Sequence, residues 1–167
     1  MNMLRVWGGG IYENDIFYDL CDQHGILVWQ DFMFACSTYP MNPEMLDNIR
    51  HEAIDNVIRL RNHPCLAIWC GNNENHTAWF NWGWMRKYKK MGVYDQMWKD
   101  HNDLFQHLLS EVVQEYDATT FYWPSSPYGG NPEARCESGK EDWNPDGDAH
   151  YWNVWQGRDP ITQFNKI

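Results

Sequence analysis

Hydrophobic and polar positions alternate along the chain in blocks that predict strands and helices in turn. Short and nearly continuous apolar runs predict strands over residues 3–7, 26–32 and 65–70. Two further runs, 119–123 and 150–155, are interpreted in the same way. Because near-continuously apolar strands are typical of a parallel sheet covered by helices, we predict an α/β fold.

Apolar residues at three- and four-residue steps predict helices between these strands. One helix is expected within residues 14–25, where Asn14 is a cap residue and a glycine ends the pattern. A second is expected within 42–64, with Asn42 as its cap and a proline at its first position. A long third helix is expected from about residue 94 to residue 116. The three glycines at 8–10 predict a tight turn, because a lone glycine cluster is weak evidence for phosphate binding.

Polar residues that are capable of chemistry follow the predicted strands: Glu13, Asp31, Asn73, Glu74, Ser125, Ser126 and His150. In a (β/α)₈ barrel the active site collects at this end of the strands. A doubly wound sheet is the alternative, but no GxGxxG segment opens a helix here. A barrel has eight strands and about 250 residues, whereas this chain of 167 residues provides five predicted strands. We therefore predict a partial (β/α)₈ barrel.

Composition and charge narrow the class of ligand. The chain has 23 acidic and 13 basic residues, a formal charge of −10, which argues against a nucleic-acid partner. No apolar run is long enough to predict a membrane span. The 11 Trp, 9 Tyr and 7 Phe residues favour a packed aromatic core on composition alone, and they also suit the flat faces of sugar rings. Carbohydrate binding is therefore a candidate function beside a purely structural role for these rings.

Metal and serine chemistry are not favoured by the sequence. The five cysteines include no CxxC pair and are expected to be buried free thiols. The seven histidines lack the spacing of metal ligands, so no metal is expected. Ser125 and Ser126 have no paired histidine and aspartate at a strand-to-helix turn, which argues against a serine hydrolase.

Three segments together resemble one enzyme family. They read MNMLRVWGGGIYENDIFYDLCDQHGILVWQDFMFACSTYP, RNHPCLAIWCGNNEN and HYWNVWQG, and they resemble the central barrel domain of family 2 glycoside hydrolases, most closely the β-mannosidase branch. The resemblance covers essentially the whole chain, so residues 1–167 would be a single incomplete catalytic barrel domain containing the second to sixth strands. It implies retaining hydrolysis of non-reducing terminal β-mannosidic bonds in an oligosaccharide or glycan, without a cofactor.

The resemblance also implies roles for particular residues. It assigns the acid/base role to Glu74 and contact with the sugar 2-hydroxyl to Asn73. Further substrate contacts are expected at Trp7, Glu13, Asp31, Trp79, His150 and Trp152. The alternative interpretation of Glu74 is a solvated loop carboxylate or a residue at a helix start.

One element of the family pattern is missing. The family nucleophile is a glutamate in a strand that reads roughly S-E-F/Y-G, and no such segment occurs in this chain. Glu133, Glu137 and Glu141 lie in a polar loop without a preceding strand and are not candidates. We expect the chain to carry the acid/base but not the nucleophile, and not to hydrolyse β-mannosides alone.

Several alternatives stay open. The parent activity could be that of a β-galactosidase or β-glucuronidase, or the chain could be a carbohydrate-binding fragment without catalysis. An unclosed sheet has two edge strands with unpaired backbone groups, so self-association is expected. A periplasmic or secreted location and a lysosomal one are both compatible with the motifs.

Overall fold

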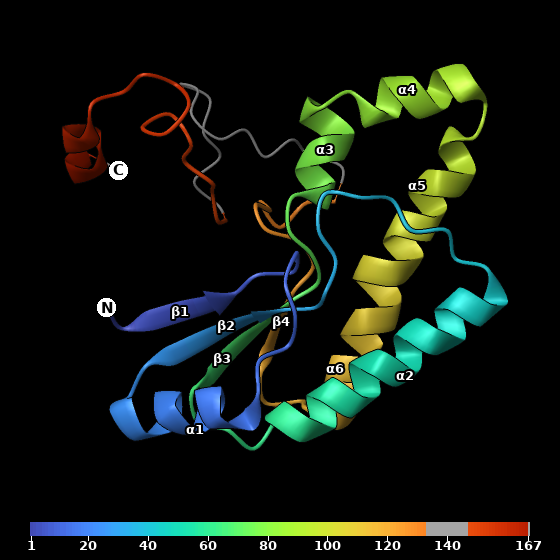
Figure 1. The fold of residues 1–167 in the computed structure, drawn as a ribbon. Coiled ribbons are helices and arrows are strands. Elements are labelled where there is room, and N and C mark those ends of the chain that lie inside the picture. Colours follow the sequence, from blue (N-terminus) through green and yellow to red (C-terminus); the bar gives the residue numbers. More distant parts are fainter. Residues whose placement is uncertain (133–146, 167) are drawn as a thin grey trace.

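Four parallel strands form the sheet of this protein, whose computed structural model describes residues 1–132 and 147–166. The strands are β1 (Met3–Val6), β2 (Leu27–Asp31), β3 (Leu66–Cys70) and β4 (Phe121–Trp123). They pair in parallel in the order β1-β2-β3-β4, as Figure 1 shows. The predicted α/β class and the first four predicted strands are confirmed.

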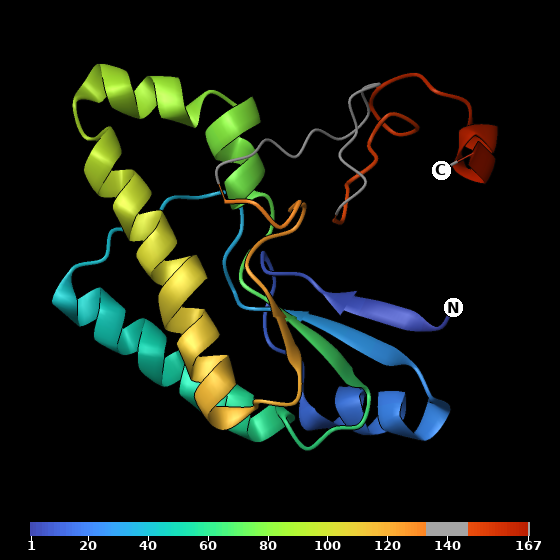
Figure 2. The ribbon, with the colours of Figure 1, turned by 180° about the vertical axis from the view of Figure 1, so that it is seen from behind.

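The helices predicted between the strands are present, and those nearest the sheet cover one of its sides (Figures 1 and 2). They are α1 (Asp15–His24), α2 (Pro43–Leu60), α5 (Tyr94–Asn102) and α6 (Leu109–Tyr116), the last two joined by a π-helical segment (Asp103–Leu108). The Asn42 side chain caps α2 by accepting a hydrogen bond from the Met45 amide at 2.9 Å. Gly25 ends α1 at φ 64°, a left-handed conformation that glycine adopts without steric cost.

Two short helices occupy the tryptophan-rich stretch for which the sequence predicts no element. They are α3 (Asn75–Asn81) and α4 (Trp84–Met91), and both lie beyond the end of β3 (Figure 1). A 3₁₀ helix (Ile161–Lys166) follows near the end of the chain. None of the helices in the described residues is both long and apolar enough to span a membrane.

The hydrophobic core lies between the sheet and its helices. Val28, Phe32 and Trp69 from the sheet are at most 1% exposed, and Val57 and Leu109 from the helices are fully buried. The rings of Phe32 and Trp69 stack with centroids 5.0 Å apart. Since successive side chains of a strand point to opposite faces, the residues between these core positions project away from the helices.

The segment 150–155, predicted as a strand, is not one. Its backbone folds into a turn in which the amides of Trp155 and Gln156 donate to the carbonyl of Trp152, each at 2.9 Å. The tryptophans that gave the segment its apolar character are exposed, Trp152 by 49% and Trp155 by 71%. A strand pattern requires rings that are buried against a layer, and these rings face a pocket instead.

The expectation of buried thiols is only partly correct. Cys21, Cys65 and Cys70 are buried, whereas Cys36 is exposed. Cys136 lies outside the described residues. Cys36 is exposed because it lies in the loop after β2, where it borders the pocket described next.

Candidate functional site

A pocket of about 450 Å³ lies beyond the carboxyl ends of the strands. Its walls come from the segments after β1, β2 and β3 and from the segment after residue 147, which are far apart in the sequence. The lining residues are Arg5, Trp7, Cys36, Asn73, Glu74, His150, Tyr151, Trp152 and Trp155.

The polar run after β3 is held in place by hydrogen bonds to the segment after β4. The Asn72 side chain donates to the Pro124 carbonyl at 3.0 Å and accepts from the Asn75 amide at 3.1 Å and the Ser125 hydroxyl at 2.7 Å. A Cβ on Gly71 would lie 2.3 Å from the Pro124 carbonyl oxygen, so only glycine permits this approach. These contacts hold the loops after β3 and β4 together and fix where the next residues point.

Glu74 and Cys36 both have left-handed backbones, which non-glycine residues rarely adopt. Their φ angles are 62° and 51°. The Glu74 amide donates to the Ser126 carbonyl at 2.8 Å, and the Cys36 amide donates to the Asn73 carbonyl at 3.0 Å. Such conformations cost about 1–3 kcal/mol each and cluster at functional sites. Both strained residues line the pocket.

The two oxygens of the Glu74 carboxyl group have different surroundings. Oε1 lies 2.7 Å from Nδ1 of His150 and 3.3 Å from Nε1 of Trp152. Oε2 has the Cys36 thiol at 3.7 Å. The hydrogen bond from His150 lowers the pKa of Glu74 below its ordinary value and outweighs burial, which acts in the opposite direction.

Arg5 connects the buried interior of the sheet to the pocket. Its guanidinium binds both carboxylate oxygens of Asp31, at 3.1 and 2.8 Å. The same group donates to Oδ1 of Asn73 at 3.2 Å and lies 3.1 Å from Nε2 of His150. Arg5 therefore orients the Asn73 amide so that its NH₂ group remains for other partners.

Ser126 does have a paired histidine, which corrects the expectation from sequence. Its Oγ lies 2.9 Å from Nε2 of His150, and His150 in turn contacts Glu74, as in a hydrolase triad. However, Ser126 is 1% exposed, does not line the pocket, and its hydroxyl lies 2.5 Å from an Asp148 carboxylate oxygen. A serine that cannot reach a substrate is not a nucleophile, so the structure gives no support to serine hydrolysis.

The structure brings together only some of the residues predicted to bind substrate. Trp7, Asn73, Glu74, His150 and Trp152 line the pocket, whereas Glu13, Asp31 and Trp79 do not. Asp31 is fully buried and also accepts hydrogen bonds from the Gly8 amide and the Trp29 indole, both at 2.9 Å. It acts on the pocket indirectly, by holding Arg5 and the Gly8 amide in place.

Trp79 is completely buried in an aromatic cluster and has no surface with which to touch a sugar. Its ring packs against those of Trp84, Tyr88, Tyr94, Trp98 and His101. An expected role as a direct substrate contact does not fit this position. Its place in the sequence, five residues after Glu74 on α3, carries it into the helical layer.

Sequence reasoning missed four lining residues: Arg5, Cys36, Tyr151 and Trp155. Arg5 had a usable signal, because a charged residue inside an otherwise apolar strand must find a partner. Cys36, Tyr151 and Trp155 lie in loops, where no periodic pattern indicates the direction of a side chain.

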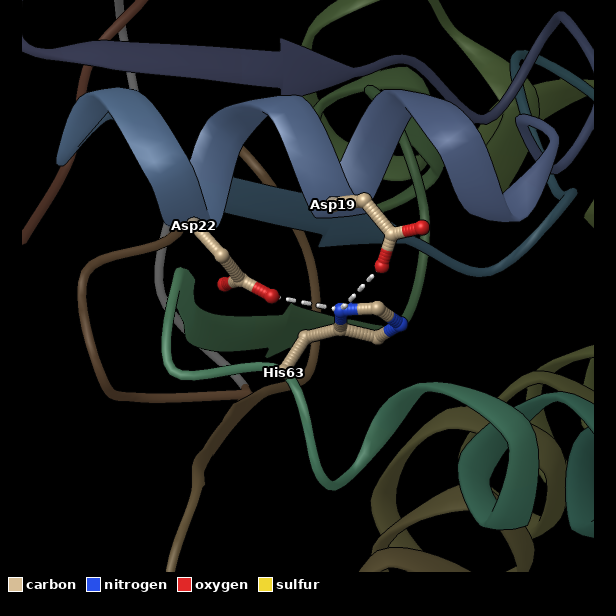
Figure 3. A group of neighbouring side chains, drawn as sticks. All are labelled: Asp19, Asp22 and His63. Carbon is tan, nitrogen blue, oxygen red and sulfur yellow. Dashed lines mark hydrogen bonds and ion pairs between the residues drawn. The ribbon is translucent and has the colours of Figure 1, made fainter.

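One group of side chains has the composition of a metal site but lies elsewhere. Asp19 and Asp22 on α1 approach His63, which precedes β3 (Figure 3). Nδ1 of His63 is 2.7 Å from Oδ2 of Asp22 and 4.0 Å from Oδ1 of Asp19. Oδ1 of Asp22 accepts from the Cys65 amide at 2.7 Å. These bonds explain why the three side chains lie together: they link α1 to the start of β3.

A carboxyl group and an amide beside tryptophans, at the ends of parallel strands, form a site of the kind that glycoside hydrolases use. No protein-family model matches the chain. Individual proteins do match. The chain is 47% identical to β-mannosidase B of Aspergillus fumigatus over 158 residues, which are 93% of this chain and 18% of that protein. It is 42% identical to β-mannosidase B of Thermothelomyces thermophilus over 157 residues, with the same two coverages.

Solved structures agree. The crystal structure of the β-D-mannosidase from Dictyoglomus thermophilum matches with a TM-score of 0.76 at 44% identity, covering 99% of this chain and 18% of that one. A β-glucuronidase from Bacteroides uniformis shares the fold over 72% of this chain and 13% of its own, with a TM-score of 0.59. The chain is thus a β-mannosidase-like sequence, and it spans 18% of the length of the β-mannosidases it matches.

Proposed function

We propose that the chain carries the acid/base part of a retaining β-mannosidase site of glycoside hydrolase family 2. The observation that carries this proposal is the position of Glu74. Its carboxyl group borders a pocket lined by Trp7, Trp152 and Trp155, and it follows Asn73 at the end of β3. The identity of about 45% to proteins named β-mannosidase supports the choice of substrate.

The sheet would be part of a (β/α)₈ barrel, with β1 to β4 as its second to fifth strands. In support, α1, α2 and α6 cover one side of the sheet (Figures 1 and 2), as helices do in a barrel. Apolar side chains of three strands remain exposed: Met3 by 40%, Leu27 by 43% and Phe121 by 59%. Closing the barrel would cover such residues and would pair the outer edges of β1 and β4, which have no neighbouring strand among the described residues.

In this proposal Glu74 first protonates the leaving oxygen of the glycosidic bond and later removes a proton from water. Asn73 hydrogen-bonds the sugar 2-hydroxyl, and the tryptophans provide faces for the sugar ring. Retention needs a second carboxyl group about 5–5.5 Å away. Among the described residues that line the pocket, Glu74 is the sole carboxylic acid. The nucleophile is therefore proposed to come from outside them, and Glu133, Glu137 and Glu141 lie outside the described residues.

The lowered pKa of Glu74 bears on its proposed role as the general acid beside a second carboxylate. A general acid must hold its proton near neutral pH, and a neighbouring carboxylate would raise its pKa. We propose that the second carboxylate has this effect in the complete site. With His150 alone as its close ionisable partner on Oε1, Glu74 favours the base form.

The test is turnover of a panel of aryl glycosides by the complete product of the gene that encodes this chain, and by this chain alone. The complete product is expected to prefer the β-mannoside, and the chain alone is expected to be inactive. A preference for β-galactoside or β-glucuronide would move the protein to another activity. Sugar binding by this chain without turnover by the complete product would favour a non-catalytic carbohydrate-binding role.

A further inference from the structure

The contacts of Arg5 determine which nitrogen of His150 carries the proton. A guanidinium has only N–H donors and cannot accept a hydrogen bond. Its NH1 group lies 3.1 Å from Nε2 of His150, so Nε2 must present a lone pair. The proton of the neutral imidazole is then on Nδ1, which lies 2.7 Å from Oε1 of Glu74. His150 therefore donates to Glu74.

This donation makes the two oxygens of Glu74 chemically different. Oε1 receives the His150 N–H and also faces the indole N–H of Trp152 at 3.3 Å. The oxygen that accepts from two N–H donors is the less favourable place for the proton of a carboxylic acid, because the O–H oxygen is a poorer acceptor than the carbonyl oxygen. Among the described residues, the partner of Oε2 is the Cys36 thiol at 3.7 Å, which can donate weakly or accept weakly. These contacts thus favour Oε2 as the oxygen that carries the transferable proton.

We propose that Arg5 is a positioning residue that acts through His150: it fixes the Nδ1–H tautomer, which occupies Oε1 and leaves Oε2 as the oxygen that exchanges the proton with the glycosidic bond. This inference rests on the proposed function for its catalytic meaning. The tautomer itself is a property of the chain without any substrate. Arg5 touches neither the reacting atoms nor Glu74 directly in this arrangement.

Ser126 competes with Arg5 for the same nitrogen. Its Oγ lies 2.9 Å from Nε2, and its proton is drawn to Oδ2 of Asp148 at 2.5 Å. Asp148 accepts at its other oxygen from the Trp123 indole at 2.7 Å and the Tyr128 amide at 2.9 Å, as an ionised carboxylate does. An oxygen whose proton is engaged there would accept from Nε2–H. Without Arg5, the network would therefore favour a proton on Nε2.

Among the described residues, charged or titratable groups from several elements lie around the Glu74–His150 pair, and Tyr151 follows His150 in the pocket lining. Arg5 comes from β1 with Asp31 behind it, Cys36 from the loop after β2, and Asp148 from the loop that also carries His150. Arg5 is the cation in this set, and its N–H donors face Nε2 of His150.

The first test is nitrogen NMR of His150 in this chain at neutral pH. The expected spectrum has a protonated Nδ1 and an unprotonated Nε2. A proton on Nε2, with Nδ1 bare, would overturn the proposal, and so would an imidazolium with both nitrogens protonated. Because no turnover is measured, this result is independent of whether the complete product is a β-mannosidase.

Two variants then separate the competing partners. Arg5→Lys keeps a cation beside Asp31 but loses the planar fork, so Nε2 is expected to gain a proton. Ser126→Ala removes the competing acceptor and is expected to leave the Nδ1–H tautomer unchanged. If Arg5→Lys does not fold, the wild-type spectrum and Ser126→Ala still decide the matter. An Nε2 proton appearing in Ser126→Ala would contradict the role given to Arg5.

The assignment of the proton to Oε2 is tested at Cys36 in the complete product. A serine hydroxyl is a stronger donor than a thiol, so Cys36→Ser is expected to stabilise ionised Glu74 and move the alkaline limb of kcat/KM to lower pH. Cys36→Ala provides no donor and is expected not to move the limb downward. Identical limbs in these two variants would contradict the assignment to Oε2, whereas absence of any β-mannoside turnover would instead refute the proposed function.

Discussion

Two histidine–carboxylate pairs in this protein have the same geometry and different surroundings. Nδ1 of His150 lies 2.7 Å from Glu74, and Nδ1 of His63 lies 2.7 Å from Asp22. The histidine side chains are equally exposed, at 16%. Distance and burial alone would therefore not tell which pair has a chemical role.

The partners of the second carboxylate oxygen make the difference. The Asp22 oxygen that does not contact His63 accepts a hydrogen bond from the Cys65 amide at 2.7 Å. Both oxygens of this carboxylate therefore hold α1 to the start of β3, and Figure 3 shows the contact with His63. The second oxygen of Glu74 has only a thiol at 3.7 Å and borders a pocket. Glu74 also has a left-handed backbone, whereas Asp22 belongs to a regular helix. A carboxylate with a free oxygen beside a pocket can exchange a proton with a ligand.

The largest expected contrast comes from the same isosteric change at both pairs. Glu74→Gln in the complete product is expected to reduce β-mannoside turnover about 10²- to 10⁴-fold, because it removes general acid–base catalysis. Asp22→Asn is expected to leave turnover per folded molecule unchanged. Steady-state kinetics with p-nitrophenyl β-mannoside measures both. Equal losses in the two variants would contradict the distinction.

The same two variants are expected to rank in the opposite order when the loss of stability is compared instead of the loss of turnover. Asp22→Asn replaces a carboxylate that accepts from Cys65 and pairs with His63, and it is expected to destabilise the chain by about 1–3 kcal/mol. Glu74→Gln is expected to change the free energy of unfolding less, because one of its oxygens has only a weak partner. Urea denaturation of this chain gives both values. A larger loss for Glu74→Gln would indicate a structural role for the pocket pair.

A third histidine, without a carboxylate partner among its ring contacts, sharpens the comparison. Burial lowers the pKa of His101 from 6.5 to about 3. The unfolded chain therefore binds this proton first as pH falls, and stability is lost between pH 6.5 and about 3. The slope expected from His101 is about 1.4 kcal/mol per pH unit. Denaturation midpoints across this range measure it, and His101→Phe, which keeps the aromatic packing, should flatten the curve.

The smallest expected effect is at Trp152. Trp152→Phe keeps a ring in the pocket but removes the N–H that faces Oε1 of Glu74 at 3.3 Å. The pKa of Glu74 is expected to rise slightly, with a change in kcat/KM of about threefold or less, as for one weak hydrogen bond. Carboxyl carbon NMR of this chain follows the pKa. A fall in pKa would show that the indole does not donate to Glu74.

The sequence predicted the parts of the fold that follow from periodic burial. Residues 66–70 and 43–60 read correctly because one face of each is packed against the core. The prediction of a strand at residues 150–155 was wrong because the tryptophans there contact a pocket, and a pocket lining can have the same apolar composition as a buried strand. The pairing of Asn73 and Glu74 was available from the family resemblance, and the structure places both in the pocket.

Contacts between segments that are far apart in the chain could not be predicted from the sequence. The approach of His150 to Glu74 joins residues 76 positions apart, and that of Arg5 to His150 joins residues 145 positions apart. No local pattern encodes such distances. Trp79 illustrates the same limit, since a tryptophan near Glu74 reads equally well as a sugar platform or as core, and here it is fully buried.

The most direct measurement of the role of Glu74 is the dependence of kcat/KM on the leaving group in Glu74→Gln of the complete product. If Glu74 is the general acid, aryl β-mannosides with poor leaving groups are expected to lose far more activity than the 2,4-dinitrophenyl substrate, whose phenolate departs without a proton. A uniform loss across the series, whatever the leaving group, would show that Glu74 does not deliver the proton.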